Sequence, residues 1–426
     1  MYLSSIFKHE ITVKTPPIEI SFSPLGSFVV IYEKYVKTDG NTEPLHNVTM
    51  WDTDTGEMVW SWVQKLQNNW VGQWSQDEFI FTRMMHSRVE IWNLKGKSDF
   101  WKIEPEVLKV EHLASFSLSP GNDPAIAVFT QNKKDTPASV KIFNMGEYKT
   151  PVAQKAFYRA DSVQFKWNKV GSHLLAFTHT DMDATGQSYY GETNVYYLDK
   201  FGKFDCRIDF DKAGPVHDVS WSPTGREFVI VYGTMPSKAT LFDHRANPIY
   251  EFGEAARNTV KFNQKGRLLL IGGFGNLSGE IDVWDRKGFQ KISTFQASNS
   301  STCEWSPDGK HILTSTLYKR LKVDNGFKIW HYSGVLIHQT DVKEMYQVEW
   351  QPFAEDTWPE RTGQSPPPAG IPVQKSGAVK PVGAYRPPGA RGLNDSPVVE
   401  RATLASLSSN LKSSRSIPGL KKSKIY

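Results

Sequence analysis

The sequence predicts an all-β protein, a β-propeller of the WD-repeat type followed by a disordered C-terminal tail. Three observations lead to this fold class. A strand–turn–strand motif recurs along the chain, its copies are spaced by roughly one blade length, and a third strand with alternating polarity follows most copies. One such unit has an apolar face that it cannot bury alone, so the units are expected to stack around a ring.

The clearest copy of the motif is Trp305-Ser306-Pro307-Asp308-Gly309. Trp305 ends a short apolar run, and residues 310–314 return as a second strand. Proline presets φ at the first turn position, and glycine accepts the positive φ that a side chain resists. Residues 326–330 then supply a third strand that ends on tryptophan.

Eight units of this kind can be aligned, with intervals of 41 to 54 residues. Their first residues are Phe22, Trp74, Leu118, Trp167, Trp221, Phe262, Trp305 and Trp350. Seven complete repeats run from about residue 19 to residue 340. The eighth, beginning at residues 347–350, is followed by a polar, proline-rich stretch, so we expect a partial closing blade. We expect residues 5–14 to form a strand that takes part in closing the ring.

The expected third strands alternate apolar and polar residues, which is the period of a half-buried strand. They occupy residues 48–52, 89–93, 140–144, 239–243, 281–285 and 327–331. Most end in Asp or Asn, which caps its own backbone and starts a turn. Independent hairpins in a sandwich are disfavoured, because a sandwich does not keep a blade-length period.

Charge and composition divide the chain at residue 358. Residues 359–426 are rich in Pro and Ser and contain eleven Lys or Arg against three Asp or Glu, a balance of +8. Since the whole chain carries +5, residues 1–358 carry −3. We therefore predict a nearly neutral propeller at 1–358 and a basic, disordered tail at 359–426. A basic appendage suggests a polyanion as partner, with RNA the first candidate.

Several classes of protein are disfavoured. No apolar run reaches the roughly 18 residues needed to span a bilayer, and no secretory signal is visible. Cys206 and Cys303 are the two cysteines, too few for a disulfide framework, which favours a reducing compartment. Neither a zinc-protease HExxH motif nor a GxSxG nucleophile elbow occurs, so we predict a non-enzymatic protein without a cofactor.

One local motif imitates a calcium-binding loop. Asp181, Asp183, Thr185 and Glu192 stand at positions one, three, five and twelve of an EF-hand pattern, with Gly186 at the sixth. The flanking residues have strand patterns rather than helical ones, so a polar hairpin loop without metal is the preferred interpretation. The glycine-rich residues 272–275 follow a strand without opening a helix, which favours bulges or tight turns between strands over a phosphate cradle.

For contact with RNA, the best candidates are basic residues on loops, which engage phosphates without reading sequence. Lys319, Arg320 and Lys322 lie in a long insertion between two strands of one blade, and Arg257 lies in a second basic loop. In the tail, further phosphate contacts that weaken with salt are expected from Arg386, Arg391, Lys421, Lys422 and Lys424. A solvated charge run remains the alternative at residues 319–322.

Several strings resemble the eukaryotic translation initiation factor 2A family. They are YYGE at 189–192, VYGTMPSKAT at 231–240, GGFGNLSG at 272–279, NGFKIWHY at 325–332, WQPF at 350–353 and AYRPP at 384–388. The resemblance covers nearly the whole chain in order. It implies a nine-bladed propeller that binds the small ribosomal subunit. It also implies GTP-independent delivery of initiator methionyl-tRNA in non-standard initiation.

We also expect a cytoplasmic monomer, with mRNA and other initiation factors as further partners. Relative to the family pattern, the sequence lacks one propeller repeat before its first residue and a basic helical region after residue 426. The alternative function is a generic WD-repeat scaffold for protein–protein interaction, unrelated to the ribosome.

Overall fold

The computed structural model describes residues 9–13, 15–37, 44–65, 71–94, 102–133, 136–181, 191–352, 357–358 and 365–371. These residues form 28 strands and no α-helix, and the strands make seven four-stranded sheets, here called blades 1 to 7. No helix that would span a membrane occurs in this described part.

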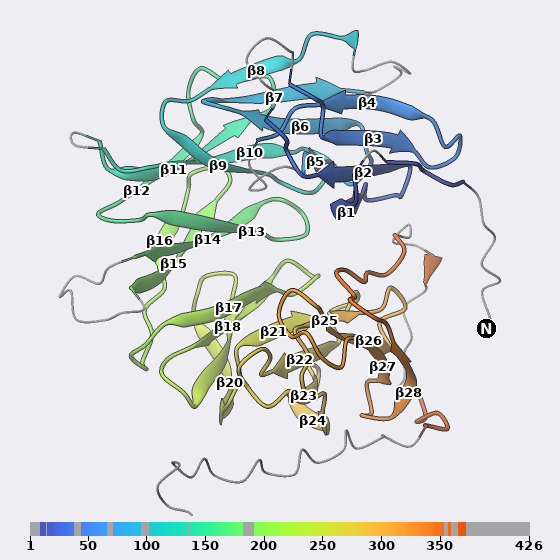
Figure 1. The fold of residues 1–426 in the computed structure, drawn as a ribbon. Coiled ribbons are helices and arrows are strands. Elements are labelled where there is room, and N and C mark those ends of the chain that lie inside the picture. The colour runs from blue at the N-terminus through green and yellow to red at the C-terminus, as the bar shows by residue number, and fades with distance from the viewer. Residues whose placement is uncertain are drawn as a thin grey trace, which may run out of the picture. The chain divides into compact units, whose positions relative to one another are not determined.

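The blades follow one another in chain order (Figure 1). Blades 1 to 3 comprise β1 (Pro17–Phe22), β2 (Phe28–Glu33), β3 (Val48–Asp52), β4 (Met58–Trp62); β5 (Gln73–Trp74), β6 (Ile80–Met85), β7 (Arg88–Asn93), β8 (Glu106–Lys109); and β9 (Leu113–Leu118), β10 (Ala125–Thr130), β11 (Ala138–Asn144), β12 (Ala153–Phe157).

Blades 4 and 5 comprise β13 (Ser162–Trp167), β14 (His173–Thr180), β15 (Glu192–Asp199), β16 (Asp205–Arg207); and β17 (Val216–Trp221), β18 (Glu227–Tyr232), β19 (Ser237–Asp243), β20 (Pro248–Ala255). Blades 6 and 7 comprise β21 (Thr259–Phe262), β22 (Leu268–Gly272), β23 (Glu280–Asp285), β24 (Gln290–Gln296); and β25 (Thr302–Trp305), β26 (His311–Thr316), β27 (Gly326–His331), β28 (Leu336–Asp341).

Each blade is an antiparallel meander, and the first strand of each is its inner strand. Neighbouring blades meet through these inner strands: β5 contacts β9, β9 contacts β13, β13 contacts β17, β17 contacts β21 and β21 contacts β25. The fold class predicted from the repeat period is confirmed. The seven complete repeats correspond to the seven blades.

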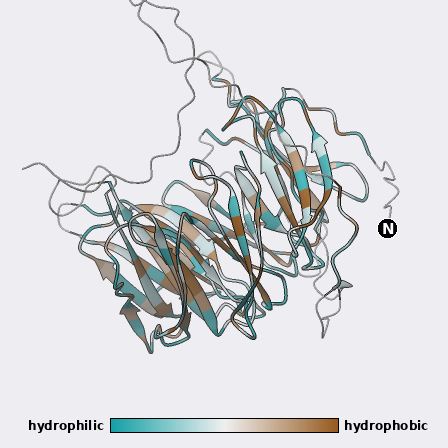
Figure 2. Ribbon diagram, turned by 90° about the horizontal axis from the view of Figure 1, so that it is seen from below, coloured by the Kyte–Doolittle hydropathy of each residue, from teal (hydrophilic) through white to brown (hydrophobic). Residues whose placement is uncertain are grey.

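The core lies between the blades. Phe129 of β10, Ile142 of β11 and Leu174 of β14 are almost fully buried in one cluster shared by blades 3 and 4. All six residues of β10 are buried, as expected for a strand covered on both faces. Figure 2 shows the apolar residues concentrated along the strands. Burial between blades therefore makes each blade depend on its neighbours.

The turn between the first and second strands forms as the sequence predicts. In blade 7, Gly309 donates its backbone N–H to Ser306 O at 2.9 Å, and Ser306 donates to His311 O at 2.9 Å. Gly309 has φ +68°, a left-handed conformation that favours glycine. Asp308 accepts the backbone N–H of Lys310 at 3.0 Å and the hydroxyl of Ser306.

In blades 5 and 7, a tryptophan at the end of the inner strand ties its blade to the preceding one. Trp221 Nε1 of β17 donates to the carbonyl of Lys166 on β13 at 2.7 Å. Trp305 Nε1 of β25 donates to the carbonyl of Lys261 on β21 at 3.0 Å. These two bonds satisfy the indole N–H groups and fix the spacing of the inner strands of blades 4 and 5 and of blades 6 and 7.

The described part of the expected eighth unit lies between blades 7 and 1 and contains no strand. Tyr318 donates its N–H to Met345 O at 2.8 Å on the blade 7 side. On the blade 1 side, the Gln347 amide accepts from Ile20 N at 3.1 Å and donates to Ile20 O at 2.6 Å. Residues 347–350 are not in a strand, and the Gln347 side chain bonds to the backbone of β1.

Two other expectations about the chain ends differ from the structure or extend beyond it. Residues 9–13, the described part of the expected strand at 5–14, are not in a strand. Residues 365–371, which fall within the predicted tail at 359–426, contact blade 7. Ser365 O accepts the Tyr332 hydroxyl at 2.8 Å, and Ile371 N donates to Leu336 O at 2.8 Å. We propose that the boundary lies nearer 373; the rest of the predicted tail lies outside the described residues.

The expectation that Arg257 is displayed on a basic loop is wrong. Its side chain is 7% exposed and Nη2 bonds Asp282 Oδ2 at 2.7 Å, while Nη1 donates to Phe252 O at 3.1 Å. Asp282, on β23, is 3% exposed and also accepts the Thr294 hydroxyl at 2.6 Å. The connection from β20 to β21 places the guanidinium in the interior, where the ion pair with the buried Asp282 compensates for its lost hydration.

Replacing Arg257 by Met should lower the free energy of unfolding by about 3 kcal/mol, because Asp282 is left buried without its main cationic partner. The double variant Arg257→Met, Asp282→Leu should recover most of that loss. Urea denaturation midpoints measure both. A single variant as stable as the parent would contradict the buried-pair interpretation.

Replacing Asp308 by Asn, and measuring stability at several pH values, tests whether the ionised Asp308 carboxylate stabilises the turn. Burial alone would raise the pKa of Asp308, but hydrogen bonds from His311, Ser306 and the Lys310 N–H more than offset it and hold the pKa well below its usual range. The stabilisation is therefore fully present above about pH 4 and is lost as pH falls through the lower folded-state pKa.

At pH 7, Asp308→Asn should cost about 2 kcal/mol of unfolding free energy. The gap between variant and parent should shrink as pH falls below 4. Urea unfolding at pH 7, 4 and 3 measures it, and a gap that does not change with pH would refute the assignment.

Candidate nucleic-acid interface

The antiparallel order of each blade separates two kinds of connection. Turns from first to second strand and from third to fourth strand leave one side of a blade, here called the turn side. Connections from second to third strand, and from each fourth strand to the next blade, leave the other, here called the loop side. In blades 5, 6 and 7 the second-to-third connections span residues 233–236, 273–279 and 317–325.

The basic loop of blade 7 presents the three cations that the sequence singled out. Lys319, Arg320 and Lys322 are all exposed. Beneath them, the loop folds on itself: Arg320 N donates to Leu317 O at 3.0 Å, and Asn325 Nδ2 donates to Leu321 O at 2.6 Å. The buried Asn325 therefore holds the loop from within while the charges face solvent.

Arg320 reaches the neighbouring glycine-rich loop of blade 6. Its Nη2 donates to Asn276 Oδ1 at 2.8 Å. The guanidinium lies over Gly275, where a Cβ would stand 2.7 Å from Nη2, and Gly275 has φ +72°. Gly275 N in turn donates to Ser300 O at 3.2 Å. The predicted tight turns at residues 272–275 thus leave room for an arginine from the next blade.

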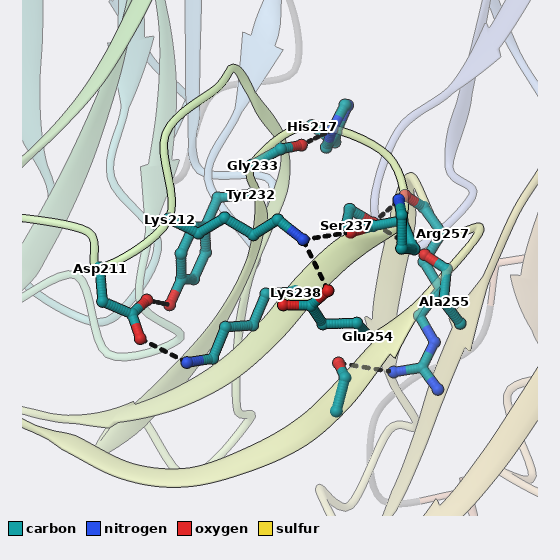
Figure 3. A network of polar contacts seen from close by, with 12 residues as sticks. Asp211, Lys212, His217, Tyr232, Gly233, Ser237, Lys238, Glu254, Ala255 and Arg257 are labelled. Atoms are coloured by element: carbon teal, nitrogen blue, oxygen red, sulfur yellow. Dashed lines mark hydrogen bonds and ion pairs between the residues drawn. The ribbon is translucent and has the colours of Figure 1, made fainter. Parts of the chain in front are cut away.

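In blade 5 the two lysines labelled in Figure 3, Lys212 and Lys238, form ion pairs with carboxylates. Lys238, 11% exposed at its side chain, pairs with Asp211 and Glu251, and these hydrogen bonds raise the pKa of Lys238. Hydrogen bonds from Lys238 and Tyr232 lower the pKa of Asp211. Burial, with the Asp211 charge, raises the pKa of Tyr232 to about 12. Because the charge of Lys238 is neutralised by its acidic partners, this network adds little positive potential to the surface.

A second set of bonds in Figure 3 ties the blade 5 loop to its surroundings. Lys212 Nζ donates to Pro236 O at 2.6 Å and to Glu254 at 2.7 Å. His217 Nε2 lies 2.8 Å from Gly233 O, and Ser237 Oγ donates to Arg257 O at 2.5 Å. The loop at 233–236 is therefore rigidly anchored on the loop side.

Of the remaining candidate residues, some lie in the part of the chain that the structure describes and others lie outside it. Asp181 and Glu192 flank residues 182–190, and their neighbours are strands β14 and β15, as predicted, rather than helices. Among the described residues, no group of three or more metal-ligating side chains is found. Outside the described residues lie Asp183, Thr185, Arg386, Arg391, Lys421, Lys422 and Lys424.

The turn side carries a different feature, a depression of about 390 Å³. Trp305, Trp350 and Trp358 contribute to its wall together with Glu304 and Glu349. Burial raises the pKa of Glu304, and the negative charge of Glu349 raises it further. The positive charge of Lys261 opposes this shift but does not cancel it. Lys169 and Lys265 also line the depression, so its wall combines aromatic side chains with charges of both signs.

Sequence reasoning missed the support that blade 6 gives to Arg320, since Asn276 is 44 residues away. It also missed the Lys238 network. A signal was nevertheless present, because two of the strings that resemble the family cover these places: residues 231–240 contain Lys238, and residues 272–279 contain the glycine-rich loop.

Comparison with known proteins agrees with that resemblance. The family model described as "Eukaryotic translation initiation factor eIF2A" matches residues 155–348. A solved structure titled "Crystal structure of the eukaryotic initiation factor" superposes with a TM-score of 0.69 at 40% identity, covering 78% of this chain and 79% of that one.

Curated relatives extend the match over most of the chain. The eukaryotic translation initiation factor 2A of Schizosaccharomyces pombe is 40% identical over 418 residues, covering 94% of this chain and 72% of the relative. That of Drosophila melanogaster is 37% identical over 384 residues, covering 88% of this chain and 60% of the relative. The chain belongs to the eukaryotic translation initiation factor 2A family.

Proposed function

We propose that this chain is a non-catalytic, cytoplasmic scaffold of translation initiation that binds the small ribosomal subunit through the loop side of blade 7. The observation that carries the proposal is the exposed basic triplet Lys319, Arg320 and Lys322, mounted on a loop that Asn325 holds from within. Membership of an initiation-factor family supports the ribosome as the source of the RNA.

The physical mechanism is electrostatic docking on a rigid support. Lysine and arginine side chains neutralise phosphates and release counterions, so they position the protein on RNA without reading its sequence. Blades that bury their cores against one another keep the loop fixed during the encounter. In this proposal the body docks, and the tail cations add phosphate contacts.

The finer role rests on the family resemblance. We propose that the docked scaffold supports GTP-independent delivery of initiator methionyl-tRNA in non-standard initiation. Messenger RNA and other initiation factors are the further partners of such a role.

Charge reversal at Lys319, Arg320 and Lys322 to Glu should weaken binding to purified small ribosomal subunits at least tenfold near 0.15 M salt. The slope of log affinity against log salt should also become less steep, because fewer counterions are released. Co-sedimentation across a salt series measures both.

The matched control reverses three exposed turn-side lysines, Lys149, Lys203 and Lys287. This control should bind nearly as the parent does, because its charges lie on the opposite side. Equal losses in the two triple variants would mean that net charge alone drives binding. Unchanged affinity in the loop-side variant would remove this site.

A second candidate function, a scaffold for protein peptides, is favoured by the turn-side depression with its three tryptophans. Aromatic side chains in a concave site are typical of protein recognition. Purification of the chain from cell extract with and without nuclease separates the two functions. A defined protein complex that survives nuclease, with no ribosomal subunit present, would favour the scaffold.

A further inference from the structure

The basic triplet contains two kinds of cation in different surroundings. Lys319 and Lys322 extend from the blade 7 loop as exposed point charges. Arg320 is exposed as well, but its guanidinium is held by blade 6 through the 2.8 Å bond from Nη2 to Asn276 Oδ1. One cation of the three therefore has a defined orientation.

Gly275 contributes to this orientation because it has no Cβ. A Cβ at this position would lie 2.7 Å from Nη2, 3.1 Å from Cζ and 3.3 Å from Nε of Arg320. The Nη2, Cζ and Nε atoms of the guanidinium thus lie close to the backbone of the blade 6 loop. A larger residue would push Arg320 off that surface, and the φ of +72° disfavours one independently.

The blade 6 loop is itself well fixed. Gly279 N donates to Gly273 O at 2.8 Å, and Ala297 N donates to Gly279 O at 2.8 Å. The side chain of Asn258 accepts from Phe274 N at 2.9 Å and donates to Phe274 O at 2.9 Å. A loop closed at its base in this way is a firm support for a neighbouring side chain.

We infer that Asn276 and Gly275 position Arg320 for a two-pronged contact with a single RNA phosphate, and this inference rests on the proposed function. One edge of a planar guanidinium engaged by Asn276 leaves other N–H groups for a ligand. A fork of this kind matches the geometry of a phosphate, which an ammonium does not. Lys319 and Lys322 supply only diffuse attraction, whereas Arg320 fixes where the RNA backbone lies.

The assignment distinguishes orientation from charge. Arg320→Lys keeps the charge and loses the fork. Asn276→Ala keeps Arg320 and loses its holder. Both changes should weaken binding to purified small ribosomal subunits about fivefold to tenfold at 0.15 M salt, while the salt slope stays that of the parent. Arg320→Ala should weaken binding similarly and reduce the slope by about one.

Two controls accompany these variants of the full chain. Ser278→Ala removes another exposed polar side chain from the same loop and should bind as the parent does. The double variant Asn276→Ala, Arg320→Ala should bind no more weakly than Arg320→Ala alone, because Asn276 acts only through Arg320. Far-ultraviolet circular dichroism and urea midpoints equal to the parent's exclude misfolding as the cause of any loss.

The results separate this inference from the proposed function. Parent-like binding by Arg320→Lys and Asn276→Ala, together with loss of binding in the triple charge reversal, would overturn the positioning role and leave the interface in place. Parent-like binding by the triple reversal would overturn the interface and the positioning role together. Additive losses in the double variant would also overturn the inference, since Asn276 would then contact the ligand directly.

Discussion

In blades 5 and 7, the bond from an inner-strand indole to the backbone of the preceding blade is the constraint that sets the spacing of the neighbouring blades. Trp221 and Trp305 each reach a carbonyl one blade away, at 2.7 and 3.0 Å. Side-chain amides repeat the link at the turns, where Asn168 and Asn263 donate to glycine carbonyls of the next blade at 3.3 and 3.1 Å. Since every loop is mounted on a blade, these bonds also set how loops of adjacent blades approach one another.

Two arginines show how an acceptor on the neighbouring blade determines whether a guanidinium is buried or exposed. Arg257 meets Asp282, a carboxylate buried on β23, and becomes part of the core. Arg320 meets Asn276, a neutral amide at the surface, and stays exposed with its charge available. A carboxylate neutralises the cation, whereas an amide only orients it. The chemistry of the acceptor, rather than the presence of a loop, separates a structural arginine from one that can meet a ligand.

What local sequence encodes was predictable, and what depends on distant pairing was not. The Ser-Pro-Asp-Gly turn, the strands on either side of it and the blade period follow from residues adjacent in the chain, and the structure has them. Exposure of Lys319, Arg320 and Lys322 also follows from their place in a long insertion. The burial of Arg257 depends on Asp282, 25 residues on, and no local pattern marks that pair. The segment at 347–350 has a strand's pattern but forms no strand, since its contacts with β1 come from the side chain of Gln347 rather than from a backbone ladder.

The site proposed at Arg320 joins residues of two blades, and this would link binding to the blade interface itself. Arg320 belongs to blade 7 and Asn276 to blade 6, the same pair of blades that Trp305 ties together through Lys261. A ligand that requires the oriented guanidinium binds only when the two blades keep their native spacing. By mass action, such a ligand stabilises that spacing by an amount that grows with its concentration over its dissociation constant. A site confined to one loop would gain nothing from blade packing, so the bridging arrangement makes the packed propeller a condition of the specific contact.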